Sequence, residues 1–145
     1  MTKATSSGGK FVVTRIMIAV SLFTVPGTSL SAQAAPGVKI TEVPRSSPGG
    51  PDEMFPISGE VSGVTQAKDF RVVIYVYAGG TWFVQPFDYS PKTEIRKDGK
   101  FETETHGGTI YAALLVKAGY TTKAQLKALP EVGGDVLARD RVAGK

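Results

Sequence analysis

The sequence predicts an all-β domain: an antiparallel, immunoglobulin-like β-sandwich of about seven short strands with one short helix. Three observations support this fold class. The chain of 145 residues contains 17 glycines and 9 prolines, which suits short elements joined by tight turns. Its longest apolar runs within the predicted domain are rich in β-branched and aromatic residues. Gly-Gly and Asp-Gly pairs separate such runs, as hairpin turns separate antiparallel strands.

The first 34 residues have the three parts of a secretory signal peptide. Residues 1–15 are polar and basic, residues 16–25 are apolar, and Ala32 and Ala34 supply the small residues of a cleavage site. We expect cleavage after Ala34 and a secreted or periplasmic protein. The alternative is a membrane anchor, but the apolar run is shorter than the roughly 20 residues that span a bilayer. No stable membrane span is therefore expected after cleavage.

Residues 35–56 have the composition of a Pro/Gly/Ser-rich linker or disordered arm. They contain five prolines, and residues 46–51 read Ser-Ser-Pro-Gly-Gly-Pro. Within this arm, residues 38–43 are the one candidate for a short edge strand. The predicted β-sandwich domain is then residues 57–145.

Residues 70–87 are predicted to form the central β-hairpin. Two apolar runs flank Gly79-Gly80, and a Gly-Gly pair between such runs is a hairpin signal. The first run is apolar on both faces of a strand, with Ile74 on one face and Tyr75 on the other. Such a strand is expected at the centre of a sheet. Pro86 cannot donate a ladder hydrogen bond, so it marks a strand end or an edge.

Further strands are predicted on both sides of this hairpin. They are residues 57–64, 93–96, 100–104, 110–116 and 135–142. Asp98-Gly99 is predicted to be a hairpin turn. The apolar run 110–116 matches the first hairpin strand in length, so these two are predicted to pair. The one predicted helix is residues 122–129, with Thr122 as its N-cap and Pro130 after its end.

The order of these sequence blocks resembles a recurrent bacterial extracellular module. The blocks are Arg71–Tyr77, Trp82–Pro86, residues 95–101, Thr105-His106, Tyr111–Val116 and residues 129–138. That module is an immunoglobulin-like β-sandwich that often lies beside glycoside hydrolases and other surface proteins. The resemblance implies a non-catalytic module and carries over no site residues.

His106 is the only histidine, and the sequence gives it no catalytic partners. Ser90 is the only serine after Ser62, so a Ser-His-acid triad is not indicated. The chain has no cysteine, which excludes disulfides and thiol nucleophiles. We interpret His106 as a turn residue beside Gly107-Gly108, and expect no catalytic residue.

The 13 carboxylates also give no clear site. A glycosidase needs two carboxylates across a cleft, and a domain of this size has little room for one. Glu102 and Glu104 lie on one side of a predicted strand, but the sequence lacks a calcium-binding loop. We therefore expect both side chains to be solvated, and expect no metal and no cofactor.

Aromatic residues in the predicted strands are the best candidates for a binding surface. Exposed aromatic rings on a flat sheet bind sugars by stacking, and exposed apolar patches usually mark a partner. Trp82 and Tyr75 are expected in the core, because a small sandwich needs large side chains to fill it. The candidates for a ligand platform are Tyr77, Phe83, Phe87 and Tyr89. The alternative is that these four residues also fill the core.

The sequence therefore predicts a secreted, non-catalytic binding or adhesion module of the cell envelope or exterior. Its partner is expected to be a polysaccharide or an envelope protein. Nucleic acid is not expected, because residues 35–145 carry 14 basic and 13 acidic side chains. Two alternatives stay open: a carbohydrate-binding accessory module with an exposed aromatic face, and a small secreted hydrolase. A coplanar aromatic strip would favour the first; a pocket with two carboxylates or His106 would favour the second.

Overall fold

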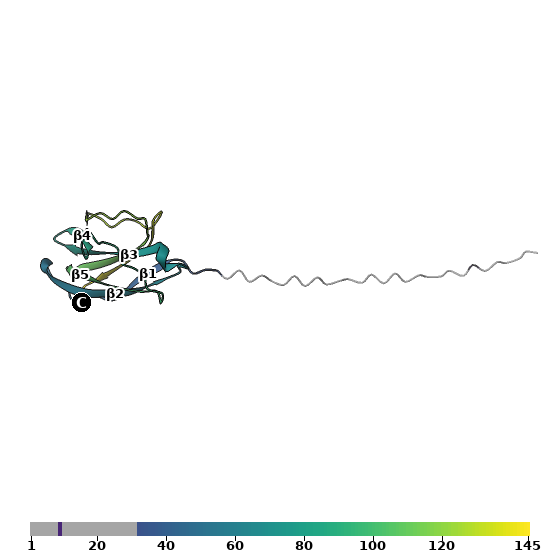
Figure 1. Cartoon of the computed structure of the whole chain (residues 1–145), viewed down its shortest axis with the longest axis horizontal. Helices are drawn as coiled ribbons and strands as arrows, with labels where there is room; N and C mark the ends of the chain where they lie inside the picture. Colours follow the sequence, from purple (N-terminus) through teal and green to yellow (C-terminus); the bar gives the residue numbers. More distant parts are fainter. Residues whose placement is uncertain (1–8, 10–31) are drawn as a thin grey trace, which may run out of the picture. The chain divides into compact units, whose positions relative to one another are not determined.

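The computed structural model describes Gly9 and residues 32–145, and it shows an all-β domain (Figure 1). The all-β prediction is confirmed. The predicted signal peptide, residues 1–34, lies outside the described residues apart from Gly9 and residues 32–34. The described part of the chain contains no helix that is long and apolar enough to cross a membrane.

Within the residues that the structure describes, eight strands form two antiparallel sheets. The strands are β1 (Gly37–Glu42), β2 (Gly50–Ser62), β3 (Phe70–Ala78), β4 (Thr81–Gln85), β5 (Lys100–Gly107), β6 (Ile110–Lys117), β7 (Gln125–Leu126) and β8 (Val136–Ala143). One sheet has the order β1-β2-β5 and the other has the order β7-β4-β3-β6-β8. A single 3-10 turn, Ala67–Asp69, precedes β3. The inner faces of the two sheets share a hydrophobic core, as in a sandwich.

Residues 35–56 belong to this sandwich, which corrects the prediction of a linker or disordered arm. They contain β1 and the first half of β2, so the domain begins well before Ile57. Ile40 is buried in the core, and its N–H donates a 2.8 Å hydrogen bond to the Asp140 carboxylate. Pro51 lies where β2 pairs irregularly with β5, between Gly50 and Met54, and such irregular positions tolerate a missing donor.

The central hairpin forms as predicted. β3 pairs with β4 through a two-residue turn in which Gly79 and Gly80 have φ values of +57° and +84°. Both values suit the primed turns of tight hairpins, which glycine adopts without strain. β3 also pairs with β6, as predicted, with Ile74 opposite Ala113.

Both faces of β3 are buried, but by different layers. Ile74 lies in the core between the sheets, and Tyr75 lies in a second cluster on the outer face of the five-stranded sheet. Residues 118–135 cover this outer face, and Leu126 and Leu129 pack against the second cluster. The five-stranded sheet therefore has one apolar layer on each of its two faces.

The predicted helix over residues 122–129 is wrong. This segment runs over the outer face in extended form and contains the two-residue strand β7. The Tyr75 hydroxyl donates to the Lys123 carbonyl at 2.8 Å, and Val84 N–H donates to the Ala124 carbonyl at 3.0 Å. An eight-residue helix is marginal by itself, so these bonds and the burial of Leu126 decide the conformation.

The predicted strand 93–96 forms only in part. Thr93 makes an isolated bridge to Val72, and Ile95 is buried in the core. The predicted turn does form: Arg96 N–H donates to the Lys100 carbonyl at 2.8 Å, and Gly99 has a φ of +80°. Only the second arm of this hairpin, β5, becomes a strand of a sheet.

Tyr75 should make the stability of the protein fall at alkaline pH. Burial raises its pKa from the ordinary 10.0 to about 12. The folded state thus holds this proton more tightly than the unfolded chain. The protonated Tyr75 therefore contributes fully to the free energy of unfolding below pH 10. This contribution is lost as the pH rises towards 12, at no more than about 1.4 kcal/mol per pH unit.

Urea unfolding at several pH values between 9 and 12 measures this effect. Tyr75→Phe should lower stability at neutral pH, because the Lys123 carbonyl loses its donor. The free energy of unfolding of this variant should also fall less steeply with pH than that of the parent protein. Equal slopes for the two proteins would contradict the assignment.

Candidate functional site

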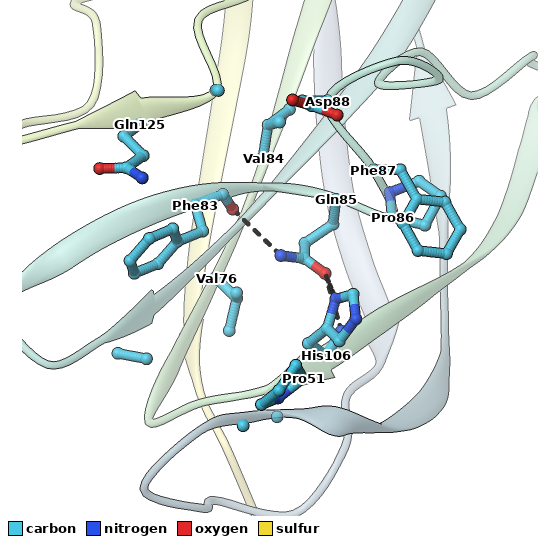
Figure 2. Close-up of a pocket in the computed structure, with 14 residues that line it drawn as sticks. Pro51, Val76, Phe83, Val84, Gln85, Pro86, Phe87, Asp88, His106 and Gln125 are labelled. Atoms are coloured by element: carbon cyan, nitrogen blue, oxygen red, sulfur yellow. Dashed lines mark hydrogen bonds between the residues drawn. The ribbon is translucent and has the colours of Figure 1, made fainter.

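A pocket with mainly apolar walls lies between the two sheets, at the side where β4 and the end of β5 come together. Its volume is about 430 Å³. Its apolar walls include Phe83, Phe87, Pro51 and Pro86, and its polar residues are Gln85, Asp88, His106 and Gln125 (Figure 2). We call it the edge pocket. The opposite side of the sandwich is closed, because β1 packs against β8 there through the Ile40–Asp140 hydrogen bond.

Gln85 links the two sheets inside the edge pocket. Its Oε1 accepts the backbone N–H of His106 at 2.7 Å and lies 2.8 Å from His106 Nδ1 (Figure 2). Its Nε2 donates to the Phe83 carbonyl at 3.4 Å. Because the backbone N–H can only donate, Oε1 must be an acceptor, and Nδ1 therefore carries the proton. In the neutral imidazole this leaves Nε2 as a hydrogen-bond acceptor for a ligand.

His106 is not the turn residue that the sequence predicted. It lies within β5 and is half-buried against Gln85 and Phe87, and its ring meets the Phe87 ring edge-on at 5.9 Å. β5 continues through Gly107, so only Gly108 and Thr109 link it to β6. Sequence reasoning missed this position because Gln85 and His106 are brought together by the stacking of two sheets.

Two of the predicted platform residues form an exposed stacked pair. The rings of Phe87 and Tyr89 are 5.0 Å apart between centroids and only 4° from parallel. Phe87 is 38% exposed and Tyr89 is 79% exposed. A tight turn brings the two together, since Ser90 N–H donates to the Phe87 carbonyl at 3.2 Å.

The four predicted platform residues do not form one surface. Phe83 is half-buried and lines the edge pocket with Phe87, while Tyr89 stacks on Phe87. Tyr77 instead lies on the outer face of the five-stranded sheet, 5.1 Å from Trp82 between ring centroids. Trp82 and Tyr75 are buried, as expected of core residues. No coplanar strip of all four rings is present.

Other residues of the edge pocket were missed by the sequence analysis, namely Gln85, Asp88 and Gln125. Gln85 offered a signal, because it is a polar residue at the end of an apolar run, and the structure buries it to 3% exposure. A buried amide needs a partner, so it indicated a contact beyond its own strand. Asp88 and Gln125 are exposed and offered no such signal.

The carboxylates do not gather at this site. Asp88 and His106 stand at different ends of the edge pocket (Figure 2). Glu102 and Glu104 are exposed on β5, as predicted, and Glu102 pairs with Arg96. Within the part of the chain that the structure describes, no group of three or more potential metal ligands lies together.

Comparisons with protein-family models, with curated proteins and with solved structures find no match for this chain. The resemblance to an extracellular immunoglobulin-like module therefore stays a prediction from the sequence.

Proposed function

We propose that this protein is an exported, non-catalytic binding or adhesion module, and that its ligand enters the edge pocket. The exposed Phe87–Tyr89 pair beside this pocket carries the proposal. Among the described residues only three large hydrophobic side chains are exposed: Phe87, Tyr89 and Val132. Two of the three are stacked together at one pocket, and clustered exposed apolar surface is typical of a binding site.

Carbohydrate is the ligand class that the polar groups of this pocket favour. The Gln85 amide is buried and both its oxygen and its nitrogen bond to protein groups, so its main role is to hold the two sheets together. His106 Nε2 and the Asp88 carboxylate are acceptors, and sugar hydroxyls are donors that match them. The ring pair can contact the apolar face of a sugar. This supports the carbohydrate-binding alternative as the second candidate.

A hydrolase is the less favoured candidate, although His106 does line a pocket. The His106 imidazole is held by a neutral amide, so no carboxylate orients it or stabilises its charged form. The described residues that line the pocket include no serine or threonine to act as a nucleophile. Asp88 does not stand beside His106 (Figure 2).

Binding to polysaccharides tests the proposal. The protein, purified from an exporting bacterium, is measured by affinity electrophoresis against a panel of neutral polysaccharides and by co-sedimentation with washed envelope fractions. Phe87→Ala and Tyr89→Ala should each weaken binding at least about tenfold, because central aromatic contacts dominate such sites. Val132→Ala is the control: it removes another exposed apolar side chain, which lies outside the pocket, and should change nothing.

Two results would contradict the proposal. Unchanged binding by both aromatic variants would remove the edge pocket from the function. A hydrolytic activity that His106→Ala lowers a hundredfold, with the fold intact by circular dichroism, would replace the non-catalytic assignment with an enzymatic one.

A further inference from the structure

A second hollow lies on the outer face of the five-stranded sheet. It has a volume of about 480 Å³ and lies between β3, β4 and β8 on one side and residues 127–131 on the other. Tyr77 and Trp82 supply its aromatic surface, with ring centroids 5.1 Å apart. We call it the outer groove. It shares no residue with the edge pocket, because Tyr77 and Trp82 point away from the space between the sheets.

Positive charge is concentrated along the outer groove. Lys127, Arg139 and Arg141 line it, against the single carboxylate of Glu131. Glu131 lies 3.7 Å from Arg139 and its side chain is 89% exposed, so the ion pair is weak and does not cancel the local charge. This contrasts with the near-neutral balance of residues 35–145 as a whole.

Arg141 is held over the aromatic surface and keeps its hydrogen-bond donors free. Its guanidinium lies 5.6 Å from the Trp82 ring centroid, in a cation–π contact. Its register partner on β6 is Ala112, which is small and leaves room for the long side chain to cross the sheet. Within the described residues, the Arg141 side chain makes neither a hydrogen bond nor an ion pair. The flat face of the guanidinium contacts the Trp82 ring, so its N–H donors, which lie in the plane of the group, stay available to a ligand.

We propose that the outer groove binds a uronic acid residue of an acidic polysaccharide. The Arg141 guanidinium would hold the carboxylate by paired hydrogen bonds, with Lys127 adding charge, because a carboxylate matches the guanidinium fork. The half-buried Tyr77 ring would contact the face of the sugar ring. A ring that bears a carboxylate uses both the cations and the aromatic surface, whereas a bare anion uses only the cations.

Trp82 reports on this site directly, because it is the only tryptophan in the chain and lies in the outer groove. The full protein is titrated with oligogalacturonate, and both Trp82 emission and binding heat are recorded. We expect saturable binding that shifts the Trp82 emission and weakens as salt is added. Arg141→Gln should weaken it at least about tenfold, and so should Tyr77→Ala.

The matched control is Arg96→Gln, which removes the same charge from an exposed position outside the groove and should alter binding less than twofold. Lys127→Gln provides a second groove variant on an exposed segment, in case Arg141→Gln disturbs the fold. Binding weakened by Lys127→Gln and not by Arg96→Gln supports the site.

Four outcomes would overturn the inference. They are absence of binding by calorimetry, equal binding of a neutral oligogalactose, equal binding of inorganic phosphate, and tighter binding of a single-stranded oligonucleotide. Because Phe87→Ala leaves the outer groove intact, it should not change oligogalacturonate binding. Failure of the edge-pocket proposal therefore leaves this test unaffected.

Discussion

Replacing Ile74 with alanine is expected to lower the free energy of unfolding by about 2–5 kcal/mol. Ile74 is fully buried in the core between the sheets, so the truncation leaves a cavity that its neighbours cannot fill completely. A domain of this size has about 5–15 kcal/mol of stability in total. Urea unfolding should show a much lower midpoint for this variant.

Leu114→Ala extends this prediction to the other apolar layer. Leu114 is fully buried in the cluster on the outer face, under residues 118–135, so its truncation should cost a similar amount. Lys100→Ala, at an exposed position, is the control and should stay within about 0.5 kcal/mol of the parent. A small effect for Leu114→Ala beside a large one for Ile74→Ala would mean that the covering segment does not seal the outer face.

Trp82→Ala should lower the free energy of unfolding by about 3–5 kcal/mol, as much as Ile74→Ala does. Trp82 is only 5% exposed and packs in the outer cluster beside Tyr77 and under Arg141. The parent protein should accordingly show blue-shifted tryptophan emission that acrylamide quenches poorly. Red-shifted, freely quenched emission from folded protein would place Trp82 on an open surface and contradict its role in the core.

Features that depend on neighbouring residues could be predicted from the sequence. The Gly79-Gly80 turn and the double-sided burial of β3 follow from turn chemistry and from alternation along one strand. The pairing of β3 with β6 was predicted from the matched lengths of two apolar runs. The turn and the alternation are local signals, so no knowledge of the rest of the fold was needed for them.

Features that depend on distant contacts could not be predicted in the same way. Residues 122–129 have helical spacing, but bonds from Tyr75 and Val84 hold them extended. The proline-rich residues 35–56 read as a linker, yet Ile40 gains burial and a partner in Asp140. In both segments tertiary contacts outweigh local composition.

The residues of the candidate site also differ in how far the sequence could predict them. Phe87 and Tyr89 were named from the sequence, because aromatic residues near a strand end are visible there. The Gln85–His106 bond was not, because it joins two sheets whose relative position no local pattern encodes. Tyr77 lies on the outer face, apart from the other three, because alternation within each strand does not show which faces of two neighbouring strands coincide.

The Ile40–Asp140 hydrogen bond joins residues that are 100 positions apart in the chain. β8, which carries Asp140, follows every other strand of the domain, so a growing chain has no partner for β1 on that side until β8 has been made. Contacts between residues so far apart in the chain are formed more slowly than local ones, which slows folding. A partly synthesised domain therefore leaves the edge of β1 without its Asp140 partner for as long as its final strand is missing.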